Sequence, residues 1–139
     1  MKPRAIEGLD PRGPLMPNVG QIVSVRLDEL RGLAEAALAA DASEAQHNLR
    51  IAAKRLRYVL EIFASCLGGE ARAARDAAKR LQSALGDLHD CDLMLAKVEQ
   101  IGSVATVLRK RRERLFDDFV ELWQAEASKG TWADLDADL

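Results

Sequence analysis

The sequence predicts an all-α protein folded as an antiparallel four-helix bundle. Apolar residues recur at the three- and four-residue spacing of helices in four long segments, and no stretch alternates with the period of two that strands show. The breaks between these segments are short, which favours antiparallel neighbours. A chain of 139 residues with 48% hydrophobic residues is long enough to bury one core of ordinary size.

The first two helices are predicted over residues 18–40 and 41–67. In the first, Asn18 is a candidate N-cap in front of the apolar series Val19, Ile22, Val23, Leu30, Leu33 and Ala37. In the second, Asp41 and Glu44 have the spacing of a capping box. Gly68 and Gly69 then end this helix, because paired glycines favour a left-handed turn.

The third helix is predicted over residues 70–100 and the fourth from about residue 103 to Gly130. The third carries a leucine seam with small residues behind it that permit close helix approach: Leu81, Leu85, Leu88, Leu95, Ala74, Ala77 and Ala78. The fourth carries Val104, Leu108, Leu115, Phe116, Phe119, Leu122 and Trp123 on one side.

These segments divide the chain into three parts. Residues 1–17 contain all four prolines and are predicted to be a poorly structured leader. Residues 18–130 form the bundle. Residues 131–139 are predicted to be an acidic, frayed tail, because Asp134, Asp136 and Asp138 lie within it.

Composition places the chain among cytoplasmic proteins without a membrane span. Cys66 and Cys91 lie in helical patterns without a second thiol at metal-ligand spacing, so we expect reduced thiols. No signal-peptide core and no apolar run of spanning length occurs. The formal net charge is −2, so affinity for an anionic partner must come from local clustering of cations.

Such a cluster occurs in the segment HNLRIAAKRLRY, residues 47–58. At 100° per residue, four cationic or titratable side chains share an arc of about 80° opposite the apolar residues. They are His47, Arg50, Lys54 and Arg57. The stripe is about 15 Å long at 1.5 Å per residue. Arginine offers a planar fork of donors, lysine a point charge, and histidine a further donor once it is protonated, and all three suit phosphate oxygens.

A second cationic stripe is predicted on the third helix. Arg72, Arg75 and Lys79 lie within about 60° of one another, and Gly86 continues their face. Gly86 either kinks the helix or exposes bare backbone to a ligand, and spacing alone favours the kink. The alternative for both stripes is a solvated face held by pairs such as Arg57–Glu61 and Arg72–Asp76.

Two further arginines fall on apolar arcs and therefore need a partner or a groove. Arg26 does so on the first helix, where a snorkelling rim position is the commoner explanation. Arg112 lies between Leu108 and Phe116 on the fourth helix, within the run RKRRER that otherwise indicates a solvated face.

Metal and nucleophile chemistry has little support in the sequence, and no cofactor is indicated. The spacing Glu44-x-x-His47 matches half of a ferritin-like site, but Gly86 stands three residues before His89, the other histidine. An HD-type metal-dependent phosphohydrolase stays an alternative, because His47, His89-Asp90 and Asp117 follow in the required order. Cations beside His47 would repel a divalent ion. No nucleophile elbow, Walker loop or Rossmann glycine pattern occurs.

Two segments together resemble the CHAD family, whose histidine-bearing α-helical domains bind inorganic polyphosphate. The first is HNLRIAAKRLRYVLEIF, residues 47–63, and the second is KRLQSALGDLHDCDLM, residues 79–94. The first motif carries over to His47, Arg50, Lys54, Arg55 and Arg57, and the second to Lys79, Gln82, Leu85, Gly86, Asp87 and Asp90. The candidate polyphosphate-binding residues from the stripes and the resemblance are His47, Arg50, Lys54, Arg55, Arg57, Arg72, Arg75, Lys79, His89 and Arg112.

The resemblance implies binding of polyphosphate by the second and third helices without catalysis, and it suggests a homodimer. A full CHAD domain has two four-helix repeats facing each other across a basic groove, whereas this chain has one, and a two-fold axis could replace the missing repeat. Nucleic acid is the rival polyanion, although Tyr58 is the only aromatic residue beside the stripe. A third possibility is an interaction module whose RKRRER run docks an acidic protein.

Overall fold

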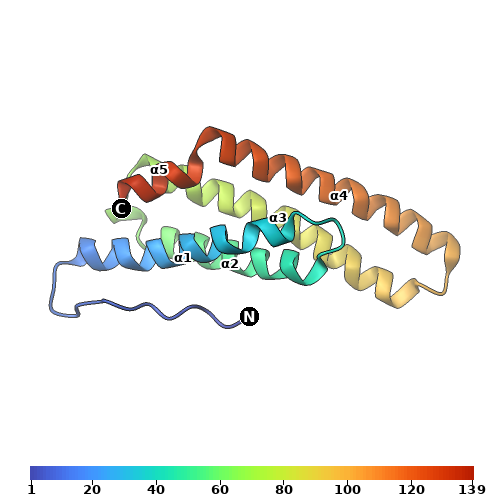
Figure 1. The fold of residues 1–139 in the computed structure, drawn as a ribbon, viewed down its shortest axis with the longest axis horizontal. Helices are drawn as coiled ribbons and strands as arrows, with labels where there is room; N and C mark the ends of the chain where they lie inside the picture. The colour runs from blue at the N-terminus through green and yellow to red at the C-terminus, as the bar shows by residue number, and fades with distance from the viewer.

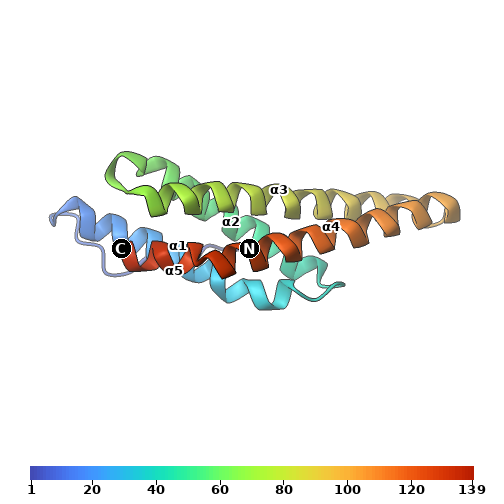
Figure 2. The ribbon, with the colours of Figure 1, turned by 90° about the horizontal axis from the view of Figure 1, so that it is seen from above.

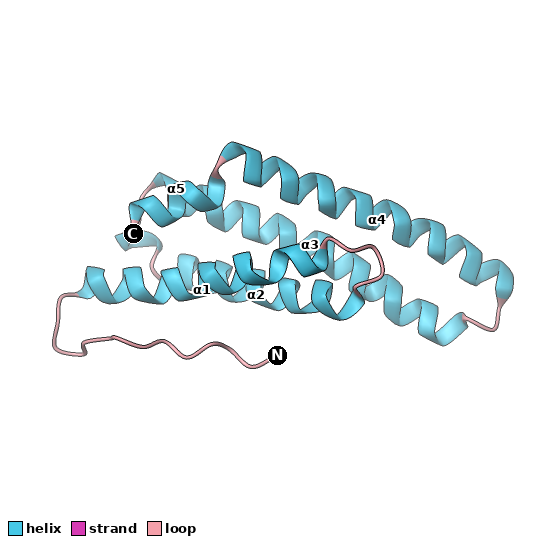
Figure 3. Ribbon diagram, viewed as in Figure 1, coloured by secondary structure: helices cyan, strands magenta, loops and turns pink.

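The computed structural model describes residues 1–139 and contains helices and connecting segments without strands (Figure 3). Its elements along the chain are α1 (Leu15–Ala37), α2 (Ser43–Ile62), the short 3-10 helix η1 (Ala64–Cys66), α3 (Gly69–Val98), α4 (Gly102–Lys129) and α5 (Thr131–Asp138). The all-α prediction is confirmed. The predicted four-helix arrangement is not, because the chain has five α-helices.

Helix α1 begins before the predicted N-cap. Its first residue is Leu15, and Pro17 lies within its first turn, where a missing N–H costs no intrahelical hydrogen bond. Asn18 therefore caps nothing. Its side-chain amide instead donates to the Asp10 carbonyl oxygen at 2.6 Å and its Oδ1 accepts from the Asp10 N–H at 2.9 Å, which ties the preceding segment to the helix.

The predicted boundaries of α2 also need correction. Ala42 is the N-cap and no side chain caps it, so the predicted capping box of Asp41 and Glu44 does not form. The helix ends at Ile62 and η1 follows, whereas the sequence pattern predicts one helix to Leu67. Gly68 has φ −90° and ψ −160°, which is extended and not the left-handed turn that the glycine pair predicts.

Consecutive long helices run antiparallel, and each packs on the next (Figure 1). The core lies mainly between α1, α2 and α3. Small residues allow α2 and α3 to approach closely, since Ala52, Ala53, Ala74, Ala77 and Ala78 are all fully buried. Leu81, Leu85 and Leu88 of the predicted seam are 1% exposed. This close α2–α3 pair positions the candidate site.

Residues 131–138 form a helix that packs on the bundle through one side, and not the predicted frayed tail. Gly130 adopts φ 75° in the left-handed region, which ends α4 and turns the chain into α5. α5 packs on α3, α4 and α1 (Figure 2). Its Trp132 is 4% exposed and stacks on Trp123 with ring centroids 5.8 Å apart. The aspartates of the segment lie on the solvent side, while Trp132 and Leu135 hold the helix in place.

A buried acidic group links these last helices. The Glu126 side chain is only 5% exposed, and it accepts hydrogen bonds from Arg80 of α3 at 2.7 Å and from Thr131 of α5. Burial raises the pKa of Glu126, but the hydrogen bonds from Thr131 and Arg80 and the charge of Lys129 bring it below its ordinary value. Glu126 therefore stays ionised and joins three helices.

The far end of the α3–α4 hairpin extends past the turn between α1 and α2 (Figure 1). It carries the exposed apolar residues Leu93, Met94, Ile101, Val104 and Val107. Both cysteines are free thiols, as predicted, and the Cys91 thiol lies 3.4 Å from the Leu108 carbonyl oxygen. None of the helices is both long and apolar enough to cross a membrane.

Candidate functional site

The candidate site is the seam where the cationic side of α2 meets α3. On α2, His47, Arg50, Lys54 and Arg57 are all half-buried at this edge of the helix pair. On α3, Arg72 and Lys79 are exposed, while Arg75, Gln82, Gly86 and His89 are half-buried. The two stripes that the helical spacing predicts thus belong to neighbouring helices, and we use the name α2–α3 groove for this cationic seam between the two helices.

The two histidines of the chain meet in this groove. The rings of His47 and His89 stack with centroids 4.3 Å apart and an interplanar angle of 24°. Burial lowers the pKa of His47, and the charges of His89, Arg50, the N-terminal ammonium and Lys54 lower it further. His47 is therefore mainly neutral at pH 7, and its Nδ1 has no hydrogen-bond partner within the protein.

Arg50 lies against α3 at Gly86. A Cβ atom at Gly86 would lie 3.4 Å from Nε of Arg50, an ordinary contact distance, so only a side chain larger than a methyl group would take the space of the guanidinium. The sequence left two roles open for Gly86, a kink and a ligand-facing surface, and neither of them includes contact with a cation of the neighbouring helix.

Buried polar atoms without a partner concentrate in the α2–α3 groove. Seven buried side-chain nitrogen or oxygen atoms in the chain have no hydrogen-bond partner, and four of them belong to groove residues. These four are His47 Nδ1, Arg50 Nε, Gln82 Oε1 and Arg57 Nε, and the last of them forms an ion pair with Oε1 of Glu61 at 3.4 Å without a hydrogen bond. Buried polar groups are normally hydrogen-bonded, so their concentration at one seam marks where a ligand could supply partners.

The family of the chain follows from comparison with family models. The CHAD domain model matches residues 7–99, about two thirds of the chain. This chain belongs to the CHAD family. No curated protein and no solved structure matches it. The CHAD match ends where α3 ends, so it contains α1, α2, α3 and every groove residue, while α4 and α5 lie outside it.

Two of the six cations of the α2–α3 groove are paired with acids. Arg57 lies 3.4 Å from Glu61, as predicted, and Arg75 lies 3.0 Å from Asp76, where the sequence predicted Arg72 as the partner. Exposed pairs of this kind contribute only about 0–1 kcal/mol, so a polyanion could replace them at low cost. The other four cations, Arg50, Lys54, Arg72 and Lys79, form no ion pair.

Two of the predicted ligands lie outside the α2–α3 groove. Arg112 reaches from α4 to Asp92, the Ala40 carbonyl oxygen, Ser43 and Gln46, so its donors are occupied within the protein. The sequence offered a partner or a groove for this arginine, and the structure gives it partners. Arg112 thus joins α4 to α3 and to the start of α2.

Arg55 is the second predicted ligand that lies outside the groove. It faces α1, where its Nη1 lies 3.6 Å from Oε2 of the buried Glu29 and its Nη2 donates to the Met1 carbonyl oxygen. The motif places Arg55 beside Lys54, but at 100° per residue the two side chains leave α2 in different directions. Arg26, which the sequence placed on an apolar arc, also pairs with Glu29.

The donor set of a metal centre is not assembled. No group of three or more His, Cys, Asp or Glu side chains lies close enough together to hold a metal ion. His47 and His89 stack on each other amid cations, whereas an HD-type site would need them beside carboxylates. The α2–α3 groove instead presents cationic side chains from two neighbouring helices.

Proposed function

We propose that this CHAD-family chain binds inorganic polyphosphate in the α2–α3 groove and does not turn it over. The observation that carries the proposal is the concentration of partnerless polar atoms among the cations of the groove, within the family-matched residues. A linear anion with a negative charge on every phosphate could pair with the cations of both helices along its length.

The free cations and the buried donors have different roles in this proposal. Lys54, Arg72 and Lys79 form no ion pair, so a phosphate can approach them without displacing an acid. Arg50 has a buried Nε without a partner, and a phosphate oxygen would supply the missing acceptor. His47 would gain a hydrogen-bond acceptor as well, and its imidazole would take up a proton when phosphate binds.

The test is a titration of long-chain polyphosphate into the full-length chain and into Arg50→Gln and Lys54→Gln. Each lost contact to a charged group is expected to weaken binding by about tenfold or more, since such hydrogen bonds contribute about 1.5–3 kcal/mol. Lys110→Gln is the matched control, because Lys110 is an exposed cation of α4 outside the groove and without an ion pair. Equal affinity of both groove variants and wild type would refute the assignment.

Binding without turnover is part of the proposal and needs its own measurement. The groove presents cations and imidazoles, which hold and orient phosphate. After incubation with the protein and Mg²⁺, the chain-length distribution of polyphosphate on a gel is expected to stay unchanged. Shortening of the polymer that follows the concentration of the protein would establish an enzyme.

Nucleic acid is the competing polyanion for the same groove. Tyr58 is 45% exposed beside Arg57, whose guanidinium lies 4.8 Å from the centre of its ring. One aromatic side chain offers little stacking for successive bases, so polyphosphate is expected to displace labelled RNA. Failure of polyphosphate to compete, with RNA binding that depends on the same residues, would favour the nucleic-acid reading.

We also propose that two copies of the chain associate through the exposed end of the α3–α4 hairpin. Leu93 lies seven residues after Gly86 on α3, hence on the same side of the helix, so this apolar surface continues the line of the groove. A second copy packed there would extend the cationic surface beyond one chain. Sedimentation is expected to give a dimer that Val107→Glu dissociates, and a monomer at high wild-type concentration would refute it.

A further inference from the structure

Residues 1–14 form a strap that is tied to the outside of the α1–α2 pair (Figure 1). Although the segment has no regular secondary structure, side chains of both helices hold its backbone. On the α1 side, the Gln21 amide donates to the Glu7 carbonyl oxygen at 3.0 Å, and Arg26 donates to the Arg4 carbonyl oxygen at 3.1 Å. The strap thus has a fixed course over the helices.

Glu29 is the centre of this attachment. Its side chain is 5% exposed, and Oε1 accepts hydrogen bonds from the Arg4 N–H at 2.8 Å and from Arg26. A buried carboxylate is costly unless its oxygens are paired, so the Arg4 N–H and Arg26 compensate the burial of Oε1. Oε2 accepts no hydrogen bond and has Arg55 Nη1 at 3.6 Å. The carboxylate and the strap depend on each other.

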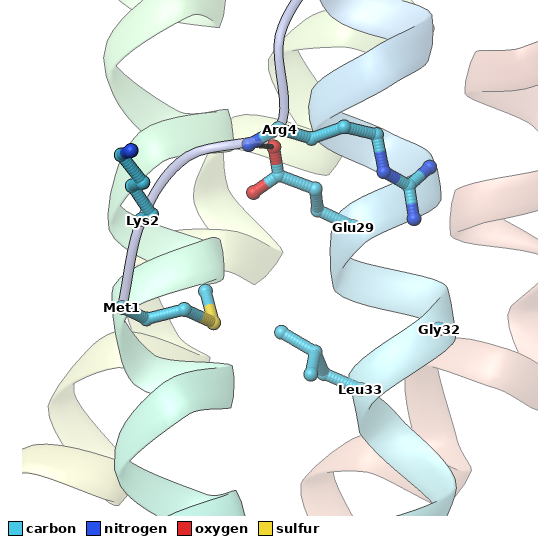
Figure 4. A pocket seen from close by; sticks show the side chains of 6 residues that line it. All are labelled: Met1, Lys2, Arg4, Glu29, Gly32 and Leu33. Carbon is cyan, nitrogen blue, oxygen red and sulfur yellow. Dashed lines mark hydrogen bonds between the residues drawn. The ribbon is translucent and has the colours of Figure 1, made fainter.

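The first residue of the strap is held by α2. Arg55 of α2 donates to the Met1 carbonyl oxygen, and Arg55 follows the stripe residue Lys54 in the sequence. Figure 4 shows Lys2 beside α2, with its amine directed away from Glu29 and from the cavity of about 250 Å³ beneath the strap. Lys2 is exposed and forms no ion pair.

The electrostatics of His47 agree with this course of the strap. Burial, His89 and Arg50 lower the pKa of His47 most, and the N-terminal ammonium is among the further charges that lower it, so the start of the strap lies within electrostatic reach of His47. The sequence gives no hint of this, since the prolines of residues 1–17 predict only a leader without regular structure.

We propose that the strap is a third wall of the polyphosphate site, with Lys2 as an additional phosphate ligand and Glu29 as the residue that positions it. This inference rests on the proposed function. Arg55 also positions the strap, because it binds the Met1 carbonyl oxygen and does not itself face the groove. The site would then consist of α2 at its centre, with α3 on one side and the strap on the other.

The first test replaces the ligand on the strap. In the full chain, with any purification tag at the C-terminus, Lys2→Gln is expected to weaken polyphosphate binding several-fold. By analogy with counterion release on nucleic acids, it should reduce the slope of log K against log salt concentration by about 0.7–0.9, the value for one phosphate contact. Lys110→Gln is the control and should change neither quantity. Wild-type affinity and slope for Lys2→Gln would overturn the inference.

The second test separates positioning from contact. Glu29→Gln is expected to accelerate hydrogen exchange of the Arg4 amide, which bonds Glu29 directly, and to lower polyphosphate affinity as much as Lys2→Gln does. In the Glu29→Gln background, Lys2→Gln should then have little further effect. Faster exchange at Arg4 with wild-type affinity would refute the positioning role. If Glu29→Gln fails to fold, Lys2→Gln still decides the inference, because Lys2 is exposed.

The two proposals fail in distinguishable ways. Wild-type protein that binds no polyphosphate would overturn the proposed function and this inference together. Binding by the wild type that depends on Arg50 but not on Lys2 would leave the groove in place and remove the strap from it.

Discussion

The ring of His47 on α2 stacks on the ring of His89 on α3, with centroids 4.3 Å apart. This contact joins the two helices that carry the candidate site. It also places a titratable group where a neighbouring imidazole and the cations Arg50 and Lys54 oppose its protonation. Both the stability of the fold and the affinity of the groove should therefore depend on pH through His47.

The first prediction concerns stability. The pKa of His47 is lower in the folded chain than its ordinary value of 6.5, so the unfolded chain binds more protons below about pH 6.5. The contribution of His47 to stability is thus complete above pH 6.5 and is lost as pH falls toward the folded pKa. Urea denaturation at pH 7.5 and 5.5 should show a smaller loss for His47→Gln than for wild type. An equal loss of stability in His47→Gln and wild type would contradict this prediction.

The second prediction concerns binding. A phosphate beside His47 favours the imidazolium, so polyphosphate should raise the pKa of His47 and binding should take up protons. Affinity is expected to increase as pH falls through about 6.5, and His47→Gln should flatten this dependence. Calorimetry in buffers of different ionisation enthalpy measures the proton uptake directly. A flat wild-type profile would make His47 a purely structural residue.

The third prediction tests, by substitution of Gly86, whether Arg50 must lie against α3 to bind polyphosphate. Gly86→Ala introduces a Cβ at 3.4 Å from Nε of Arg50, an ordinary contact, and should raise the free energy of unfolding by about 0.5–1 kcal/mol through helix propensity. Affinity for polyphosphate should change little. Gly86→Leu fills the space of the guanidinium and should weaken binding about as much as Arg50→Gln. Wild-type binding by Gly86→Leu would show that Arg50 need not lie against α3.

The fourth prediction separates Arg112 from the groove. Arg112→Ala leaves Asp92 and the buried Gln46 without their partner, so the free energy of unfolding should fall by about 2–4 kcal/mol. Chemical denaturation measures the change. At a temperature where the variant is folded, its polyphosphate affinity should equal that of wild type. Loss of affinity without loss of stability would restore Arg112 as a ligand.

The fold was predictable to the extent that helical periodicity is a local property. The apolar series of α3 and α4 predicts both helices to within one or two residues, because each long helix carries its own pattern. The capping box at Asp41 and the cap at Asn18 failed because capping depends on how the preceding chain approaches the helix. α5 was missed because three aspartates obscured Trp132 and Leu135, whose role depends on distant helices.

The candidate site was likewise predictable only where its features are local to one helix. Which residues of α2 share a face follows from the 100° rotation per residue, so the stripe from His47 to Arg57 could be read from spacing. The stacking of His47 on His89 and the position of Arg50 against Gly86 depend on the register between two helices, which one sequence does not reveal. The destinations of Arg55 and Arg112 depend on Glu29 and Asp92, acids that lie 26 and 20 residues away.

The position of α5 has a consequence for how the chain acquires its structure during synthesis. Arg31 of α1 pairs with Asp136 of α5 at 3.2 Å across 105 residues of sequence, whereas α1, α2 and α3 meet as neighbours along the chain. Local pairs close first, and distant ones bear the larger loop-closure entropy. A nascent chain can therefore assemble α1, α2 and α3 on the ribosome, but the end of the bundle near Arg31 closes only when residues 131–138 have emerged.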